Sequence, residues 1–203
     1  MNVRRIGLFG GTFNPPHMAH LLMANEVAEK LQLDEVRFMP NAVPPHKLKQ
    51  GDATAQQRLE MTRRAIADNA KFVLEPFEIE RGGVSYSYET MLQLTKREPD
   101  VQFYFIIGGD SIDELHTWYQ IDELVKLVRF VGVGRPGYLS ESVYDVERVE
   151  APLMDLSSTL IRDRLKNKTT VTYLLPEAVE QYIREEGLYG TRSFTCGDEN
   201  PYA

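Results

Sequence analysis

The chain has little cysteine. Cys196 is its single one, which excludes an internal disulfide and a cysteine metal cluster. Basic residues are a minority, with 23 Lys and Arg against 30 Asp and Glu and a net charge of −7. This balance argues against a general nucleic-acid binder, because such a protein neutralises phosphates with Lys and Arg, but it permits a local basic pocket.

Long apolar runs are missing too. None approaches about 18 residues, and a strand begins too soon after Met1 for a signal peptide. We therefore expect a cytoplasmic protein with no membrane or nucleic-acid partner. The motifs G-x-x-x-x-G-K-[ST] and G-x-G-x-x-G are also absent, so neither a P-loop kinase nor a dinucleotide oxidoreductase is supported.

What the chain does contain is an alternation of short apolar runs with helical patterns. Strands are expected at residues 3–9, 35–40, 71–80, 101–108 and 129–134, with an edge strand at 145–152, and helices at 20–32, 54–69, 85–98 (capped by Ser87), 157–167 and 176–186. Strands separated by helices indicate βαβ units. We predict an α/β fold, a Rossmann-like parallel sheet flanked by helices, as one domain over residues 1–189 with a mobile tail at 190–203.

In such sheets, ligands bind at the carboxyl ends of the strands. Three loops lie there: "GGTFNPPHMAH" (10–20), "PNAVPPHK" (40–47) and "GGDS" (108–111). In the first, glycines free of Cβ atoms and a helix start together suit a polyphosphate. His17 and His20, three residues apart, are expected to face the same side and reach the phosphates. The alternative for the two glycines is a structural turn. The alternatives for the two histidines are plain helix surface or a zinc site, although zinc normally takes three or four ligands.

Two segments carry a resemblance to a known superfamily. "GGTFNPPHMAH" resembles the H-x-G-H signature of the nucleotidyltransferases, and "SSTLIR" (157–162) resembles their second signature, I-S-S-T-x-I-R. Within that superfamily, "GTFNPPH", "PPHK", "VSYS", "GGDS" and "TWY" are similar to the bacterial nicotinate-nucleotide adenylyltransferases, and the resemblance spans about residues 3–189. The chain departs from the pattern at Asn14 (commonly Asp), Ala19 (Gly), Ser87 (commonly Thr) and Leu156 (Ile).

The resemblance implies transfer of AMP from ATP to nicotinate mononucleotide, giving nicotinate adenine dinucleotide and pyrophosphate, with Mg²⁺ carried by ATP and no protein metal ligand. The implied catalytic residues are His20, His17, Arg162 and Lys47. The implied ATP-binding residues are Gly10, Gly11, Thr12, Phe13, Gly108, Asp110, Ser157, Ser158, Thr159 and Arg162. The implied acceptor-binding residues are Lys47, Ser87, Trp118, Tyr119 and Arg135.

Each role has a plainer alternative. Lys47 is otherwise a solvated surface lysine, and Asp110 is otherwise the N-cap of a helix. A single Trp such as Trp118 is more often a core residue, although the polar sequence around it suggests an indole in an exposed loop. "SSTLIR" alone is typical of a capped amphipathic helix. Two other functions also stay open: adenylyl transfer to nicotinamide mononucleotide or pantetheine phosphate, and a non-catalytic nucleotide sensor. Homo-oligomer formation is left open.

Overall fold

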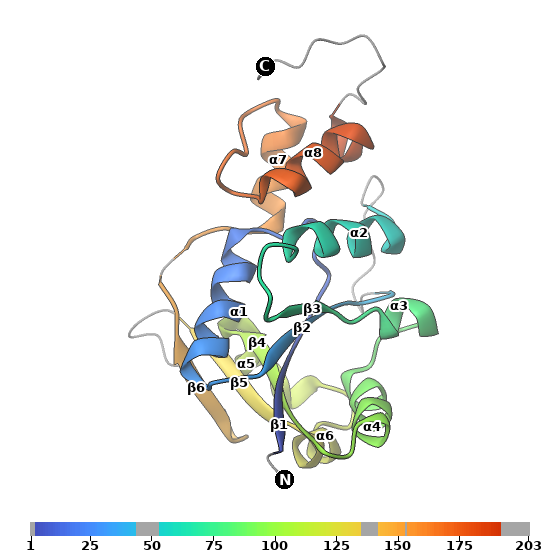
Figure 1. Ribbon diagram of the computed structural model, residues 1–203, viewed down its shortest axis with the longest axis vertical. Coiled ribbons are helices and arrows are strands. Elements are labelled where there is room, and N and C mark those ends of the chain that lie inside the picture. Colours follow the sequence, from blue (N-terminus) through green and yellow to red (C-terminus); the bar gives the residue numbers. More distant parts are fainter. Residues whose placement is uncertain (1–2, 44–52, 135–141, 153, 192–203) are drawn as a thin grey trace.

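A six-stranded parallel sheet forms the centre of the molecule (Figure 1). The computed structural model describes residues 3–43, 53–134, 142–152 and 154–191, without the side chain of Asp110. The strand order is β3-β2-β1-β4-β5-β6, and each neighbouring pair is parallel. Their bounds are β1 Arg4–Gly11, β2 Glu35–Pro40, β3 Phe72–Leu74, β4 Val101–Gly108, β5 Arg129–Gly134 and β6 Val146–Glu150. The predicted fold class is confirmed, and β6 is the predicted edge strand.

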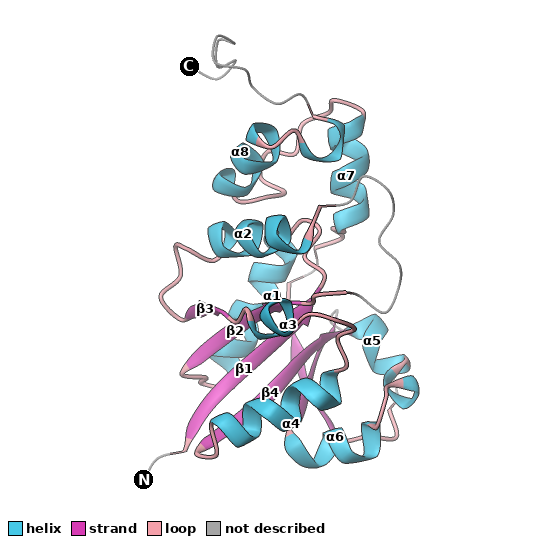
Figure 2. Ribbon diagram, turned by 90° about the vertical axis from the view of Figure 1, so that its right-hand side faces the viewer, coloured by secondary structure: helices cyan, strands magenta, loops and turns pink. Residues whose placement is uncertain are grey.

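Helices cover both faces of this sheet, and each face has its own core (Figure 2). The bounds are α1 Met18–Lys30, α2 Ala55–Ala65, α3 Phe77–Arg81, α4 Ser87–Arg97, α5 Gly109–Asp113, α6 Ile121–Leu127, α7 Ser158–Lys166 and α8 Glu177–Glu185, with 3₁₀ turns η1 Leu115–Thr117 and η2 Leu188–Gly190. No helix in the described ranges is both long and apolar enough to cross a membrane.

Successive side chains of a buried strand point to opposite faces of the sheet, so they belong alternately to the two cores. In β1, Ile6 and Leu8 point to the core beneath α4, α5 and α6, whereas Phe9 points to the core beneath α1 and α2. Helices α7 and α8 lie at the end of the molecule toward which β1 runs, far from its start at Arg4 (Figure 1). The carboxyl end of β1 therefore points toward the C-terminal helices.

The described structure corrects three predicted elements. The expected strand at 71–80 ends at Leu74, and Phe77–Arg81 forms helix α3 instead. Ser87 is the first residue of α4 rather than its cap, because Tyr86 holds the N-cap position. Helix α2 ends at Ala65 rather than near Asn69, although the predicted capping box between Thr54 and Gln57 is confirmed.

Candidate active site

The loop after β1 is built around a buried aromatic ring. Phe13 is 2% exposed, and its ring lies edge-on to Phe9 with centroids 5.6 Å apart. A Cβ on Gly11 would lie 3.0 Å from that ring, a tight contact that glycine avoids. Gly10 and Gly11 lie in β1, not in a turn, which rules out the turn interpretation. Their contact with ATP stays a prediction.

Two histidines stack at the start of α1. The rings of His17, the N-cap residue, and His20 lie 3.6 Å apart with an interplanar angle of 22°. The backbone N–H of His17 donates to Nδ1 of His20 over 3.1 Å. The ring of Phe13 lies edge-on to His20, with centroids 5.1 Å apart. The prediction that both histidines share one side of the helix start is confirmed.

Burial keeps both imidazoles neutral at pH 7. It lowers the pKa of His17 to about 4. Burial, and secondarily the neighbouring His17, lower the pKa of His20 well below its usual 6.5. Because Nδ1 of His20 accepts a hydrogen bond, its neutral ring carries the proton on Nε2. His20 therefore offers an N–H donor without a full positive charge.

The two signature segments meet at the same place. Helix α7 is capped by the Ser157 hydroxyl, which accepts from the N–H of Leu160 over 3.2 Å. The Ser158 hydroxyl donates to the carbonyl oxygen of Pro15 over 2.8 Å. Arg162 donates to the carbonyl oxygen of Asn14, also over 2.8 Å. The second signature is thus a capped helix and, in addition, a direct support of the first loop.

Asn14 joins this loop to the C-terminal part of the fold. Its side-chain oxygen accepts from the Tyr189 hydroxyl over 2.6 Å and from the N–H of Ala53 over 3.4 Å. The amide oxygen does the bonding here, which explains why Asn serves where the family commonly has Asp. The sequence did not single out Tyr189 or Ala53, since neither lies in a motif.

The loop after β2 packs directly against the loop after β1. Asn41 donates from its backbone N–H to the carbonyl oxygen of Gly11 over 3.0 Å and from its amide to the Thr12 hydroxyl over 3.3 Å. A buried arginine of α2, Arg58, donates to both loops. Sequence reasoning missed Arg58 because a charged residue in a helix is normally solvated. The predicted Lys47 lies in the same loop but outside the described residues.

The third loop starts where β4 ends. Gly108 holds the N-cap position of α5, and Asp110 is the second residue of that helix. The N-cap alternative for Asp110 is therefore wrong, while its predicted contact with ribose rests on a side chain that is not described. Arg135 likewise lies outside the described residues.

The predicted acceptor residues differ in exposure. Trp118 is partly buried, with its ring edge-on to Phe105 at 5.8 Å and to Phe130 at 6.0 Å, so the expectation of an exposed-loop indole is wrong. Tyr119 is 51% exposed, and its ring lies 4.9 Å from that of Tyr86. Tyr86 directly precedes Ser87, so the fold brings Tyr119 to the start of α4.

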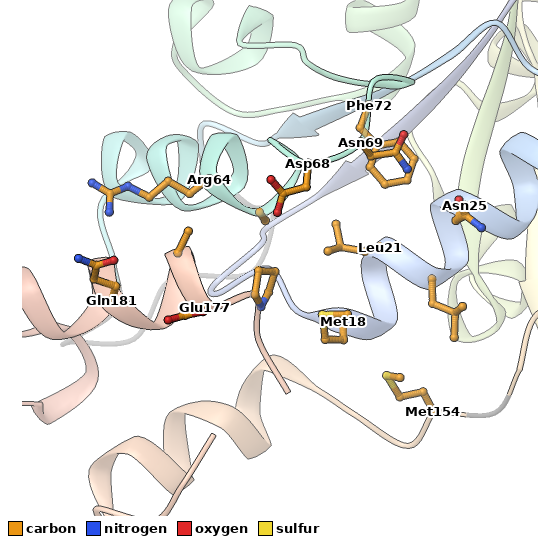
Figure 3. A pocket seen from close by; sticks show the side chains of 14 residues that line it. Met18, Leu21, Asn25, Arg64, Asp68, Asn69, Phe72, Met154, Glu177 and Gln181 are labelled. Atoms are coloured by element: carbon orange, nitrogen blue, oxygen red, sulfur yellow. The ribbon is translucent and has the colours of Figure 1, made fainter. Parts of the chain in front are cut away.

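A cavity of about 710 Å³ lies beside this site, between α1, α2 and α8 (Figure 3). Met18 and Leu21 of α1 line one side of it, and Glu177 of α8 the other. The residues lining it include none of those predicted to bind ATP or acceptor. In the described ranges, no group of three or more His, Cys, Asp or Glu side chains is placed to hold a metal ion.

Comparison with known proteins shows the class to which this chain belongs. The cytidylyltransferase-like family model matches residues 8–164. At finer level, the chain is 57% identical over 186 residues to a probable nicotinate-nucleotide adenylyltransferase of Lactiplantibacillus plantarum, covering 92% of this chain and 88% of that protein. A protein of the same name from Geobacillus thermodenitrificans is 51% identical over 189 residues, covering 93% and 88%. The chain belongs to the nicotinate-nucleotide adenylyltransferase family.

Solved structures agree on the fold. The Plasmodium falciparum nicotinic acid mononucleotide adenylyltransferase complexed with NaAD aligns with a TM-score of 0.78 at 18% identity, covering 92% of this chain and 97% of that one. The same enzyme complexed with APC aligns with a TM-score of 0.76. At this identity the likeness shows the fold alone.

Proposed function

We propose that this protein transfers AMP from ATP to nicotinate mononucleotide, forming nicotinate adenine dinucleotide and releasing pyrophosphate, a step of NAD biosynthesis. One observation carries the proposal: the Asn14–Pro15 stretch of the first signature accepts hydrogen bonds from Ser158 and Arg162 of the second, beside the stacked histidines. The relatives that share 51–57% identity with this chain bear the name of that activity.

The chemistry asks for position and charge rather than for a covalent intermediate. An oxygen of the acceptor's 5′-phosphate attacks the α-phosphorus of ATP, and the bond from that phosphorus to the bridging oxygen breaks as pyrophosphate leaves. Both polyanions must be held in line, and the charge on the transferred group must be stabilised. A neutral Nε2–H of His20, aimed by the bond to its Nδ1, is suited to donate to an α-phosphate oxygen.

We assign the remaining roles by position. His17 and the backbone of Gly10 to Phe13 would contact the polyphosphate. The first turn of α7, with Ser158, Thr159 and Arg162, would hold the β- and γ-phosphates through backbone N–H groups and the guanidinium. The hydroxyl of Ser157 already caps α7, so this residue would contribute through its backbone. Gly108 and Asp110 would meet the ribose.

On the acceptor side, Lys47 is proposed to hold the 5′-phosphate, with Arg135 as a further cation. Ser87 and the free N–H groups of the first turn of α4 would receive the nicotinate carboxylate. Tyr119 would offer its ring face to the pyridine, and the partly buried Trp118 would support the wall behind it.

Mg²⁺ is proposed to arrive with ATP, where its phosphate oxygens and water supply the oxygen ligands that this ion prefers and the ion neutralises phosphate charge. The described histidine, serine and arginine side chains fit a phosphate rather than a magnesium ion. Both substrates are water-soluble nucleotides, which suits action in the cytoplasm.

The test is pyrophosphate release from Mg-ATP with nicotinate mononucleotide, nicotinamide mononucleotide or pantetheine phosphate as acceptor. We expect nicotinate mononucleotide to exceed the others in kcat/KM by at least about 10-fold. The hydroxyl and N–H donors of the proposed site match a carboxylate, whereas the NH₂ group of an amide would place a second donor opposite them. Equal rates with the amide would reject the acceptor assignment. ATP binding without turnover on any acceptor would favour the sensor alternative.

A further inference from the structure

Helix α2 carries a completely buried arginine. The side chain of Arg58 is 0% exposed, whereas Arg63 of the same helix is exposed. A charge taken out of water is costly unless hydrogen bonds replace its hydration. The position therefore needs a set of acceptors arranged around the guanidinium.

Those acceptors belong to two different substrate loops. Nη1 of Arg58 donates to the carbonyl oxygen of Thr12 over 2.8 Å and to the amide oxygen of Asn41 over 3.2 Å. Nη2 donates to the carbonyl oxygens of Asn41, over 2.7 Å, and Ala42, over 3.0 Å. Thr12 follows β1 in the proposed ATP loop, while Asn41 and Ala42 follow β2 in the proposed acceptor loop. One rigid planar group thus fixes the two loops to each other.

The connection continues toward the proposed carboxylate site. The N–H of Ala42 donates to the Ser85 hydroxyl over 3.1 Å, and the N–H of Ser85 donates to the carbonyl oxygen of Val43 over 3.4 Å. Ser85 lies two residues before Ser87 and the start of α4. A displacement of the Arg58 guanidinium would therefore be felt at three of the segments that are proposed to contact substrate: the loop after β1, the loop after β2 and the start of α4.

We infer that Arg58 is a positioning residue that sets the distance between the bound ATP and the bound acceptor. The inference rests on the proposed function, because it gives the two loops their substrates. Arg58 needs no contact with either substrate. In-line attack requires the acceptor oxygen and the α-phosphorus to approach correctly, and a misplacement of about 1 Å costs roughly 10²-fold in rate. Loops that each bind normally but sit wrongly would produce that loss.

The test replaces Arg58 by Lys, which keeps the charge but lacks the planar fork, and by Met, which removes it. Binding of nicotinate mononucleotide and of an ATP analogue with a methylene group between the α- and β-phosphorus is measured separately by calorimetry, and kcat by pyrophosphate release. For Arg58→Lys we expect kcat to fall by at least about 10-fold while each dissociation constant stays within about three-fold. The matched controls Arg63→Lys and Arg63→Met, on the exposed face of α2, should keep kcat within two-fold.

Several outcomes overturn the inference. An Arg58→Lys enzyme with unchanged kcat makes the guanidinium a core residue only, and unchanged kcat with weakened binding makes it a binding residue. If neither Arg58 variant folds, Ser85→Ala tests the same connection from its outer end: a fall in kcat with normal binding supports it, and unchanged kcat rejects it. Inactivity of the unaltered enzyme would instead reject the proposed function, so the two failures are distinct.

Discussion

Arg162 donates a hydrogen bond of 2.8 Å to the carbonyl oxygen of Asn14, a residue 148 positions earlier in the chain. Its other terminal nitrogen donates to the Thr159 hydroxyl over 3.2 Å. The guanidinium is thereby oriented from both sides, by the loop that follows β1 and by the first turn of α7. A side chain held in this way can meet a phosphate without first losing conformational freedom.

Arg162→Lys is expected to reduce kcat/KM for ATP by about 10²-fold or more. An ammonium group keeps the charge, but it cannot bond the Asn14 carbonyl and also present a planar pair of donors to phosphate. The measurement is steady-state pyrophosphate release, with Arg164→Lys as the control because Arg164 bonds the carbonyl of Thr170 instead. Nearly normal kinetics for Arg162→Lys would show that its role is confined to holding the loop.

His20→Ala is expected to lower kcat by about 10²-fold or more with the fold intact, because it removes the donor that we propose acts on charge in the transition state. His20→Gln and His20→Asn refine this prediction. The amide nitrogen of Gln can take the place of Nε2, whereas that of Asn lies near Nδ1, so Gln should retain more activity. The measurement is kcat of the three His20 variants, compared with kcat of the unaltered protein. A higher KM at normal kcat would assign His20 to ground-state binding.

Ala19→Gly should lower the melting temperature slightly and leave kcat within a few-fold. Ala19 lies inside α1, is 7% exposed and has no positive φ, so the family's glycine is not needed there for backbone reasons. Alanine stabilises a helix interior by up to ~1 kcal/mol over glycine, and less in the first turn. Thermal unfolding and ATP kinetics are to be measured on both proteins. Much tighter ATP binding by the glycine variant would reveal that the Ala19 methyl crowds the nucleotide.

Glu78→Gln should change how stability depends on pH. Glu78 is 3% exposed, the Thr90 hydroxyl donates to it over 2.7 Å, and burial raises its pKa above the usual 4.5. Since the folded state holds this proton more tightly than the unfolded state, the carboxyl costs stability as pH rises from about 4.5 through the raised pKa. Glutamine keeps an acceptor for Thr90 and has no proton to lose.

The melting temperature of Glu78→Gln relative to the unaltered protein should therefore rise over that pH range. A gain of about 1 kcal/mol would appear as roughly 2–4 °C in a chain of this size. Glu80→Gln, on the same helix, serves as the control. A difference in melting temperature that is the same at every pH would contradict the prediction.

The strands were predictable where burial on both faces makes a sequence continuously apolar. Residues 101–108 are nearly continuously apolar, and they form a strand with the predicted bounds for that reason. "FEIE" was misleading because its apolar–polar alternation has the period of a strand, although these residues lie in helix α3, whose N-cap is Pro76. The local pattern of residues 77–80 led to a predicted strand, whereas in the structure these residues form α3, which packs beside β2.

The candidate site was predictable where a motif places a side chain next to a strand end. The loop that carries the histidine pair and the second signature lie together, joined by the bond from Ser158 to the carbonyl oxygen of Pro15. Arg58 and Tyr189 were not predictable, because their partners are backbone or amide oxygens brought near only by the tertiary fold. Trp118 was misjudged because polar neighbours in sequence do not reveal Phe105 and Phe130 behind it.

The hydrogen bond between Tyr189 and Asn14 joins an early and a late part of the chain, which matters for the order in which the loop after β1 acquires its partners during synthesis. A ribosome makes the loop after β1 early, but the hydroxyl that bonds its Asn14 follows 175 residues later. Ser158 and Arg162, two further supports of this loop, also emerge late. A chain synthesised only as far as β6 has all six strands of the described sheet but lacks the side chains of Ser158, Arg162 and Tyr189 that bond this loop. The loop after β1 therefore gains its last supports only once α7 and η2 have been synthesised.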